Sequence, residues 1–236
     1  IPNVRAYDPA YAYEVVVIIH RGLKCMYQNQ EDVFYYLTLE NENYVQPRMP
    51  NAVEDGIIKG MYKLIEGGQT DNPKVQLLAS GALVNEMIEA SILLKDDWNI
   101  DSDIWSVTSY SELHREAEDK SRWNILHPQE AAKTSYVGSC MQPENGPVIA
   151  ISDYVKLVAE QIAPYIECPF VALGTDGFGR SETRDELRRF FEVNRYYIVM
   201  TALDALNREN KIDKSQIKDA IDKYKIDPEK PNPVTV

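Results

Sequence analysis

The chain has 236 residues, of which 44% are hydrophobic and 26% are charged, so it can bury one sizeable core or two modest ones. Its 37 acidic residues outnumber 25 basic ones and give a net charge of −12, which argues against binding to nucleic acid or to an anionic membrane surface. No apolar run reaches the roughly 20 residues that a membrane-spanning helix needs, and the amino end lacks a signal-peptide pattern.

The three cysteines, Cys25, Cys140 and Cys168, are far apart in the sequence and form no Cys-x-x-Cys pair. An odd number at such spacing predicts neither a disulfide framework nor a zinc site. We therefore expect a reducing, cytoplasmic location and no metal site.

The first part of the chain predicts a helix, a strand and a polar loop. Apolar residues recur at helical spacing over residues 9–28, with Glu14 off that face. Residues 33–39 are rich in aromatic and β-branched side chains, which favours a strand. The loop over residues 40–50 leaves a strand end, where ligands gather in α/β sheets. Glu42 is therefore a candidate acid or hydrogen-bond acceptor, although an exposed loop carboxylate is the more common explanation.

A glycine- and asparagine-rich stretch over residues 67–73 is the clearest boundary signal, and it divides the chain into portions 1–66 and 67–236. Beyond it, strand and helix patterns alternate. Strands are predicted over 75–79, 104–107, 148–151 and 170–173, and helices over 83–95, 154–162, 195–208 and 214–224. This alternation predicts an α/β fold with a mostly parallel, doubly wound sheet.

Several helix starts carry capping residues. Ser109 or Ser111 is suited to cap a helix after the second of these strands, and Asp153 one that begins at residue 154. Thr183 is expected to cap a further helix, with Glu186 as its capping-box partner.

That further helix follows the most distinctive stretch of the chain, Leu173-Gly174-Thr175-Asp176-Gly177-Phe178-Gly179-Arg180-Ser181. We expect the strand over 170–173, this glycine turn and the helix after Thr183 to form one strand-turn-helix unit. Arg184, Arg188 and Glu192 lie off the apolar face of the helix, and the alternation of basic with acidic residues favours a solvated surface.

The same glycine turn is a candidate anion site. Backbone N–H groups around Gly177, Gly179 and Ser181 could hold a phosphate near a helix start. The chain has neither Gly-x-x-x-x-Gly-Lys-Ser/Thr nor an ordered Gly-x-Gly-x-x-Gly, so a tight turn is the more common explanation.

No self-contained catalytic constellation is present. The sequence has no Gly-x-Ser-x-Gly elbow, no His-Glu-x-x-His and no cysteine beside a histidine. His20, His114 and His127 are isolated in sequence, which favours structural roles, and Trp123 is expected in the core.

A family resemblance adds to this interpretation. The stretch from Leu173 to Ser181 resembles the carboxy-terminal signature of the homodimeric pyruvate dehydrogenase first component, the thiamine-diphosphate-dependent decarboxylase of the bacterial complex. Matches in the same order cover nearly the whole chain. They include Asp8-Pro9-Ala10-Tyr11, Asn41-Glu42-Asn43-Tyr44, Val75-Gln76-Leu77-Leu78, Ser106-Val107-Thr108-Ser109, Trp123-Asn124 with Leu126-His127-Pro128, and Asp153-Tyr154 with Lys156-Leu157.

The resemblance implies a transketolase-like carboxy-terminal domain over residues 67–236, preceded by the end of a pyrimidine-binding domain over residues 1–66. It implies a parent enzyme that decarboxylates pyruvate with thiamine diphosphate and magnesium and passes the acetyl group to lipoyl groups of an acetyltransferase component. The parent is expected to be a homodimer whose partner subunit covers the surface near Glu42. The diphosphate-binding Gly-Asp-Gly motif is absent, and the activating glutamate is expected before Ile1, so this chain alone is expected to scaffold and dimerise without turnover.

One position departs from the family pattern. The tyrosine that Tyr44 matches is followed by histidine in familiar members, whereas Val45 can neither donate a proton nor form a side-chain hydrogen bond. Glu42 and Asn43 are then the remaining candidate catalytic residues of the loop. Two alternatives stay open: a non-catalytic assembly module, and a stand-alone α/β module that binds phosphate or a nucleotide at the turn from Gly177 to Ser181.

Overall fold

The computed structural model describes residues 1–68, 70–142 and 144–236. Its central element is a five-stranded sheet of order β3-β5-β4-β6-β7. The strands are β3 (Tyr62–Ile65), β4 (Lys74–Ala79), β5 (Asp101–Ser106), β6 (Val148–Ile151) and β7 (Phe170–Leu173). All neighbouring pairs are parallel except β3 with β5, which is antiparallel. The predicted mostly parallel α/β sheet is confirmed.

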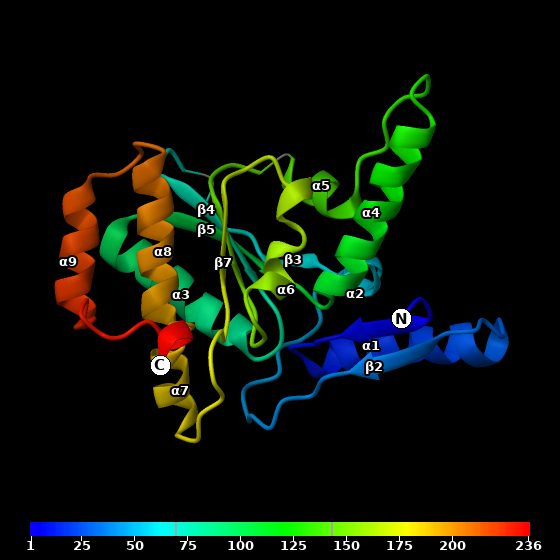
Figure 1. The fold of residues 1–236 in the computed structure, drawn as a ribbon, viewed down its shortest axis with the longest axis horizontal. Coiled ribbons are helices and arrows are strands. Elements are labelled where there is room, and N and C mark those ends of the chain that lie inside the picture. Colours follow the sequence, from blue (N-terminus) through cyan, green and yellow to red (C-terminus); the bar gives the residue numbers. More distant parts are fainter. Residues whose placement is uncertain (69, 143) are drawn as a thin grey trace.

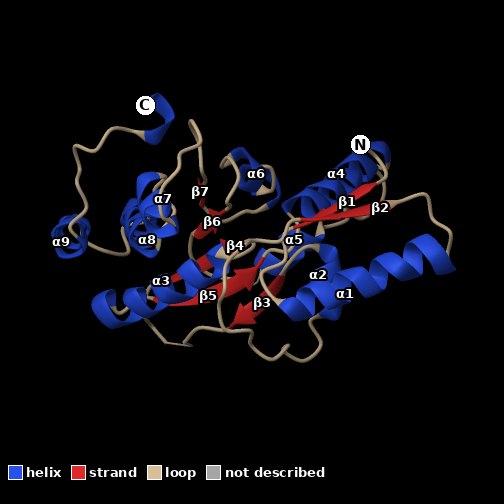
Figure 2. Cartoon of the chain, turned by 90° about the horizontal axis from the view of Figure 1, so that it is seen from below, coloured by secondary structure: helices blue, strands red, loops and turns tan. Residues whose placement is uncertain are grey.

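Helices cover both faces of this sheet, as Figures 1 and 2 show. One core lies beneath α3 (Leu83–Trp98), α8 (Arg195–Arg208) and α9 (Lys214–Tyr224), and the other beneath α4 (Tyr110–Leu126), α5 (Tyr136–Met141) and α6 (Leu157–Glu160). Alternate residues of β4 serve the two cores: Leu77 belongs to the first and Leu78 to the second. Coverage of both faces of the sheet explains why β6 and β7 are continuous apolar runs.

The amino-terminal part forms a second, smaller layer beside the main sheet (Figure 1). Two strands, β1 (Val4–Tyr7) and β2 (Phe34–Leu37), pair in parallel, and α1 (Ala12–Leu23) connects them before ending in a π-helical turn, Lys24–Gln28. A Cβ atom at Gly22 would lie 3.2 Å from the Tyr35 ring, so glycine permits α1 to pack closely on β2. The short helix α2 (Glu54–Lys59) completes this layer.

Glu14 joins the two layers. The spacing of apolar residues puts it off the buried face of its helix, but the structure buries it completely. Its Oε1 atom accepts hydrogen bonds from the hydroxyls of Tyr62 and Ser106, each at 2.6 Å, and its Oε2 atom accepts from the backbone N–H groups of Ala10 and Tyr11. Burial raises the pKa of Glu14, and these hydrogen bonds oppose the rise.

The strand β3 belongs to the five-stranded sheet although it lies within the portion 1–66. A boundary at residue 67 would therefore place β3 in a different portion of the chain from the strand it pairs with. The boundary stays a prediction. Within the boundary stretch, Gln69 lies outside the described residues.

Two predicted helix starts differ from the structure. Asp153 caps no helix: α6 begins at Leu157 and has Lys156 at its N-cap, so the helix expected over 154–162 is much shorter. Thr183 does stand at the N-cap of α7 (Arg184–Phe190), but its side chain accepts no hydrogen bond, so the capping box with Glu186 is absent. Ser109, by contrast, caps α4 by accepting a hydrogen bond from the backbone N–H of Glu112 at 3.0 Å.

Candidate functional site

The strand order creates a topological switch point at the carboxyl edge of the sheet, which is the place where the chain changes the direction in which it adds strands. From the central strand β4 the chain moves to β5 on one side and then to β6 on the other. The loops that follow β4 and β6 therefore diverge, and in α/β sheets ligands bind in the crevice between two such loops. In this chain an amino-terminal segment, residues 38–46, lies across that position.

Glu40 holds this segment against the loop after β4. The backbone N–H of Ala82, at the start of α3, donates to Glu40 Oε1 at 2.9 Å, and Gly81 has a φ of +56°. A carboxylate here meets the positive end of the helix dipole. Burial raises the pKa of Glu40, and the hydrogen bond from Ala82 opposes that rise. The sequence did not point to Glu40, because its partner lies 42 positions away.

The same segment is also held against the loop after β6. The Tyr154 hydroxyl lies 2.8 Å from Thr38 Oγ1 and 2.9 Å from Asp8 Oδ1. Asp8 in turn accepts a backbone hydrogen bond from Gly81 at 3.0 Å. The amino-terminal part of the chain thus contacts both loops of the switch point.

Glu42, the sequence-predicted candidate, forms a bidentate ion pair with Arg188 of α7. The Arg188 Nη2 and Nη1 atoms donate to Glu42 Oε2 and Oε1 at 2.6 and 3.2 Å. Arg184 lies farther out, with its Nε atom 3.5 Å from Glu42 Oε2. Arg188 is only 7% exposed, so the prediction that it lies on a solvated helix face is wrong. Both oxygens of the Glu42 carboxylate thus accept hydrogen bonds from the Arg188 guanidinium.

The ion pair continues into a network. Arg188 Nη1 also approaches Glu86 Oε1 of α3 at 3.4 Å, and Arg195 of α8 donates to Glu86 from its backbone N, its Nε and its Nη2 atoms at 2.8 to 3.0 Å. Burial alone would raise the pKa of Glu86, but the hydrogen bonds from Arg195 outweigh it and lower that pKa. The network therefore ties residues 38–46 to α3, α7 and α8.

The other loop residues face outward. Asn43 and Val45 are exposed, Val45 by 87%. Tyr44 between them donates to the carbonyl oxygen of Ala10 and packs edge-on against Tyr11, with ring centroids 6.1 Å apart. The segment is thus held by Glu40, Glu42 and Tyr44 and presents Asn43 and Val45 to the surface.

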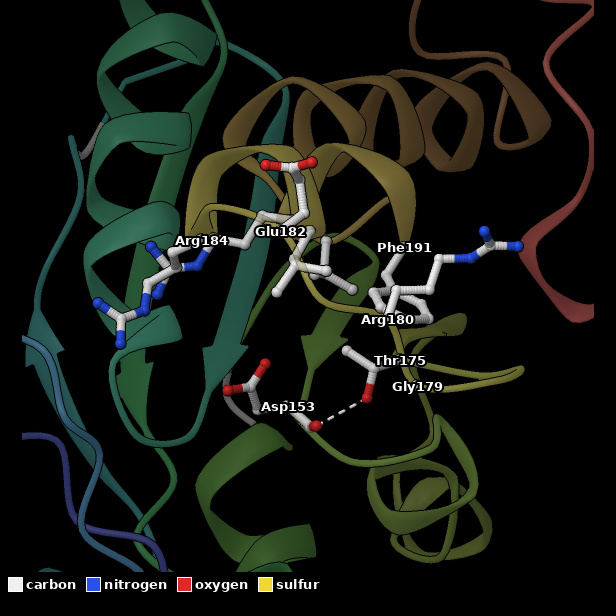
Figure 3. A pocket seen from close by; sticks show the side chains of 10 residues that line it. Asp153, Thr175, Gly179, Arg180, Glu182, Arg184 and Phe191 are labelled. Carbon is white, nitrogen blue, oxygen red and sulfur yellow. Dashed lines mark hydrogen bonds between the residues drawn. The ribbon is translucent and has the colours of Figure 1, made fainter.

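A pocket of about 570 Å³ lies beside this network, beneath α7 (Figure 3). Asp153 follows β6 and Thr175 follows β7; the Thr175 hydroxyl donates to the Asp153 carbonyl oxygen at 2.7 Å. In Figure 3 the side chains of Arg180 and Arg184 extend to opposite sides of the pocket. The guanidinium of Arg180 lies 4.3 Å from the centre of the Phe190 ring.

The glycine turn does not open directly into a helix. Gly177, Gly179 and Ser181 lie in an exposed loop, and α7 begins only at Arg184. Gly177 has a φ of +109° and packs beneath the Pro233 carbonyl, whereas a Cβ atom at Gly179 would meet nothing within 4 Å. Of these three residues, Gly179 lines the pocket. Anion binding at the turn stays a prediction.

The remaining aromatic and histidine candidates lie away from this edge. Trp123 is half-buried at the end of α4, not in the core as predicted, and stacks on His127 at 4.3 Å, with Lys133 Nζ 3.5 Å from its ring centre. His114 Nδ1 lies 3.1 Å from the carbonyl oxygen of Gln161. Each of these contacts is made to another residue of the chain.

Groups of His, Cys, Asp and Glu side chains hold metal ions in proteins. Within residues 1–68, 70–142 and 144–236, no group of three or more His, Cys, Asp or Glu side chains could hold a metal ion. Both oxygens of Glu42 are already used by Arg188. The described part of the chain therefore shows no cluster of that composition. Nor does it contain a helix with the length and apolar character that would cross a membrane.

Two family models match the chain. The model described as "Transketolase-like TK C-terminal domain" matches residues 60–194, and the model described as "Pyruvate dehydrogenase E1 component middle domain" matches residues 1–47. The chain therefore belongs to the transketolase-like family.

Named relatives give a closer description. The chain is 50% identical over 237 residues to the pyruvate dehydrogenase E1 component of Cupriavidus necator, and 51% and 48% identical to those of Pseudomonas aeruginosa and Escherichia coli K12. These matches cover 99 to 100% of this chain but only 26 to 27% of each relative. The predicted family resemblance is confirmed, and the chain spans about a quarter of the relatives' length.

Solved structures agree on the fold. Transketolases from Pichia stipitis (a mutant) and Campylobacter jejuni each match with a TM-score of 0.56 and 17% identity, over 87% and 86% of this chain and 25% and 26% of theirs. A structure described as "Split gene transketolase, inactive beta4 tetramer" matches with a TM-score of 0.53 and 15% identity, over 88% of this chain and 59% of its own.

Proposed function

We propose that this chain is part of a pyruvate dehydrogenase E1 component, which decarboxylates pyruvate with thiamine diphosphate and passes the acetyl group to lipoyl groups of an acetyltransferase component. The observation that carries the proposal is about 50% identity to named E1 components along the whole chain. Agreement between the two family models and the fold adds support.

Within that enzyme, the proposed role of this chain is to scaffold and position. Thiamine diphosphate would supply the electron sink for decarboxylation. It and magnesium would be held mainly by other parts of the parent, since the described residues gather no metal-binding group. Glu42 and Asn43 are the proposed contributors from this chain, Asn43 because it is exposed and Glu42 because it fixes the loop. Residues 1–66 would belong to the pyrimidine-binding domain and residues 67–236 to the third domain.

The proposed partners are a second copy of the chain and the remainder of the parent, in the cytoplasm. Support comes from α1, which is apolar around most of its circumference, although only one side packs on the fold. Apolar side chains on the outer side of α1 and of the π-helical turn that follows it are exposed: Val16 by 66%, Ile19 by 48%, Leu23 by 49% and Tyr27 by 75%. Exposed apolar side chains that lie along one side of a helix favour association. The split-gene transketolase structure is described as an inactive tetramer, and for this chain alone we likewise expect self-association without activity.

The test compares the 236-residue chain with the full-length protein that contains it. Pyruvate-dependent release of carbon dioxide is measured for each, with thiamine diphosphate and magnesium present, and acetyl transfer to a lipoyl domain is measured for the full-length protein. We expect both activities in the full-length protein and neither in the chain alone. Release by the chain alone would overturn the scaffold role, and a full-length protein inactive on pyruvate would overturn the enzyme assignment.

A further inference from the structure

The helix α7 contacts the rest of the fold through Arg188 and Arg184 and through the carbonyl oxygen of Phe190, which accepts a hydrogen bond from Lys230 Nζ at 2.7 Å. The seven residues of α7 follow a loop, and residues 177–186 are all exposed. Among the seven residues of α7, Arg188 is the buried one. A helix this short has little intrinsic stability, so its position depends on such tertiary contacts.

Arg188 is shared by groups that lie far apart in the sequence. It pairs with Glu42, 146 positions away, and with Glu86, 102 positions away. Glu40 and Asp153 also lie within its electrostatic reach: burial raises the pKa of each of these two carboxyl groups, and Arg188 opposes part of that rise. Arg188 thus lies among four carboxyl groups from different parts of the chain, of which it contacts Glu42 most closely and shares Glu86 with Arg195.

We propose that Arg188 is a positioning residue that couples residues 38–46 to α7, so that releasing either segment releases the other. In the described part of the chain the two segments are joined by the bidentate Glu42–Arg188 pair and by Arg184, whose Nη2 atom donates to the Asn41 carbonyl oxygen at 2.6 Å. Arg188 is the buried member of the two arginines, so it is the one expected to fix the segments together. Removing a partner leaves a buried charge unpaired, which costs far more than losing an exposed ion pair. The inference rests on the proposed function, because the coupled segment carries Glu42 and Asn43.

Hydrogen exchange in the full-length protein tests the coupling directly. In Arg188→Met, amide exchange should be at least about tenfold faster in both 38–46 and 184–190 than in the unchanged protein. The matched control is Arg189→Met, which removes the adjacent exposed arginine of the same helix and should leave both segments unchanged. Unchanged exchange at 38–46 in a folded Arg188→Met protein would overturn the proposal.

A second variant keeps the test decisive if Arg188→Met does not fold. Glu42→Gln changes only the amino-terminal segment, yet coupling requires faster exchange in α7, 146 positions away. Arg188→Lys, which retains the charge but loses the bidentate geometry, should restore part of the protection. Fast exchange confined to 38–46 in Glu42→Gln, with α7 unchanged, would show two independent segments and refute the coupling.

Activity separates this inference from the proposed function. In the full-length enzyme, Arg188→Met should lower kcat for pyruvate more than it raises KM, because the loop is displaced while the substrate-binding residues outside this chain remain. Coupled exchange with unchanged kcat would sustain the link between the segments and refute the role of residues 38–46 in catalysis. Absence of coupled exchange refutes the inference whatever the activity.

Discussion

The carboxylate of Glu40 lies so close to Gly81 that a Cβ atom at position 81 would overlap its Oε1 atom. The glycine also has a φ of +56°, which residues with a side chain rarely adopt. Backbone conformation and the contact with Glu40 thus both favour glycine just before the N-cap residue of α3.

Gly81→Ala should therefore destabilise the chain by at least about 1 kcal/mol from backbone conformation, with a further cost for displacing Glu40. Urea unfolding followed by circular dichroism measures the change. In a Glu40→Ala background the cost of Gly81→Ala should be smaller, because the overlap is gone and only the backbone term remains. Equal costs in the two backgrounds would show that Glu40 does not fill this position.

Replacement of Glu14 by glutamine should be costly although the two side chains have the same shape. Each of the two oxygens of Glu14 accepts two hydrogen bonds. In glutamine one oxygen is replaced by an N–H₂ group, which cannot accept hydrogen bonds from the two donors at that position. We expect a loss of about 2 to 4 kcal/mol in the free energy of unfolding. The exposed control Glu229→Gln should stay within about 0.5 kcal/mol, and a similar result for Glu14→Gln would contradict its role as the joint between the layers.

Asp103 should contribute to acid sensitivity. Burial alone would raise its pKa, but hydrogen bonds from Lys74, from the backbone N–H of Gly67 and from Gln76 outweigh burial and lower the pKa from 3.8 to about 2. A carboxyl group with a lowered folded-state pKa stabilises the protein above pH 3.8, and this stabilisation is lost as the pH falls toward 2. The contribution is about 2 kcal/mol.

The measurement is the free energy of unfolding between pH 5 and 2, a range set by that pKa shift. Asp103→Asn should be less stable than the unchanged chain at pH 5, and the difference should shrink toward pH 2. A difference that stays constant over this range would show that the loss comes from packing and not from charge.

Phosphate should not raise the melting temperature of the chain. The glycine loop precedes α7 by several exposed residues, and the guanidinium of Arg180 lies over Phe190. Thermal unfolding is followed with rising phosphate at constant ionic strength, using chloride as the reference. A rise that Ser181→Ala and Arg180→Met abolish would instead support the predicted anion site at Gly177, Gly179 and Ser181.

Local signals in the sequence were sufficient for much of the main sheet. The bounds of β6, β7, α8 and α9 agree with prediction. The two strands are short apolar runs between turn residues. The two helices have Asn194 and Asp213 as N-cap residues, and the side chains of both accept hydrogen bonds from the first turn. Such signals are contained within a few residues, so no knowledge of distant contacts is needed.

Distant contacts explain what the sequence did not reveal. The strand β1 was not predicted, because its four residues include Arg5 and are ordered by pairing with β2, about 30 positions later. An arginine between acidic residues on a helix indicates a solvent-facing position, yet Arg188 is buried by two glutamates from other parts of the chain. Glu42 was a candidate from its place in a loop, whereas its arginine partner depends on the tertiary fold.

Residues 38–46 rest on the ends of both diverging strands, where many sheets of this architecture receive a diffusible molecule. In this chain the polypeptide itself occupies that position. To engineer a small-molecule binding site there, residues 38–46 would have to be removed or rerouted before any binding side chains could be introduced.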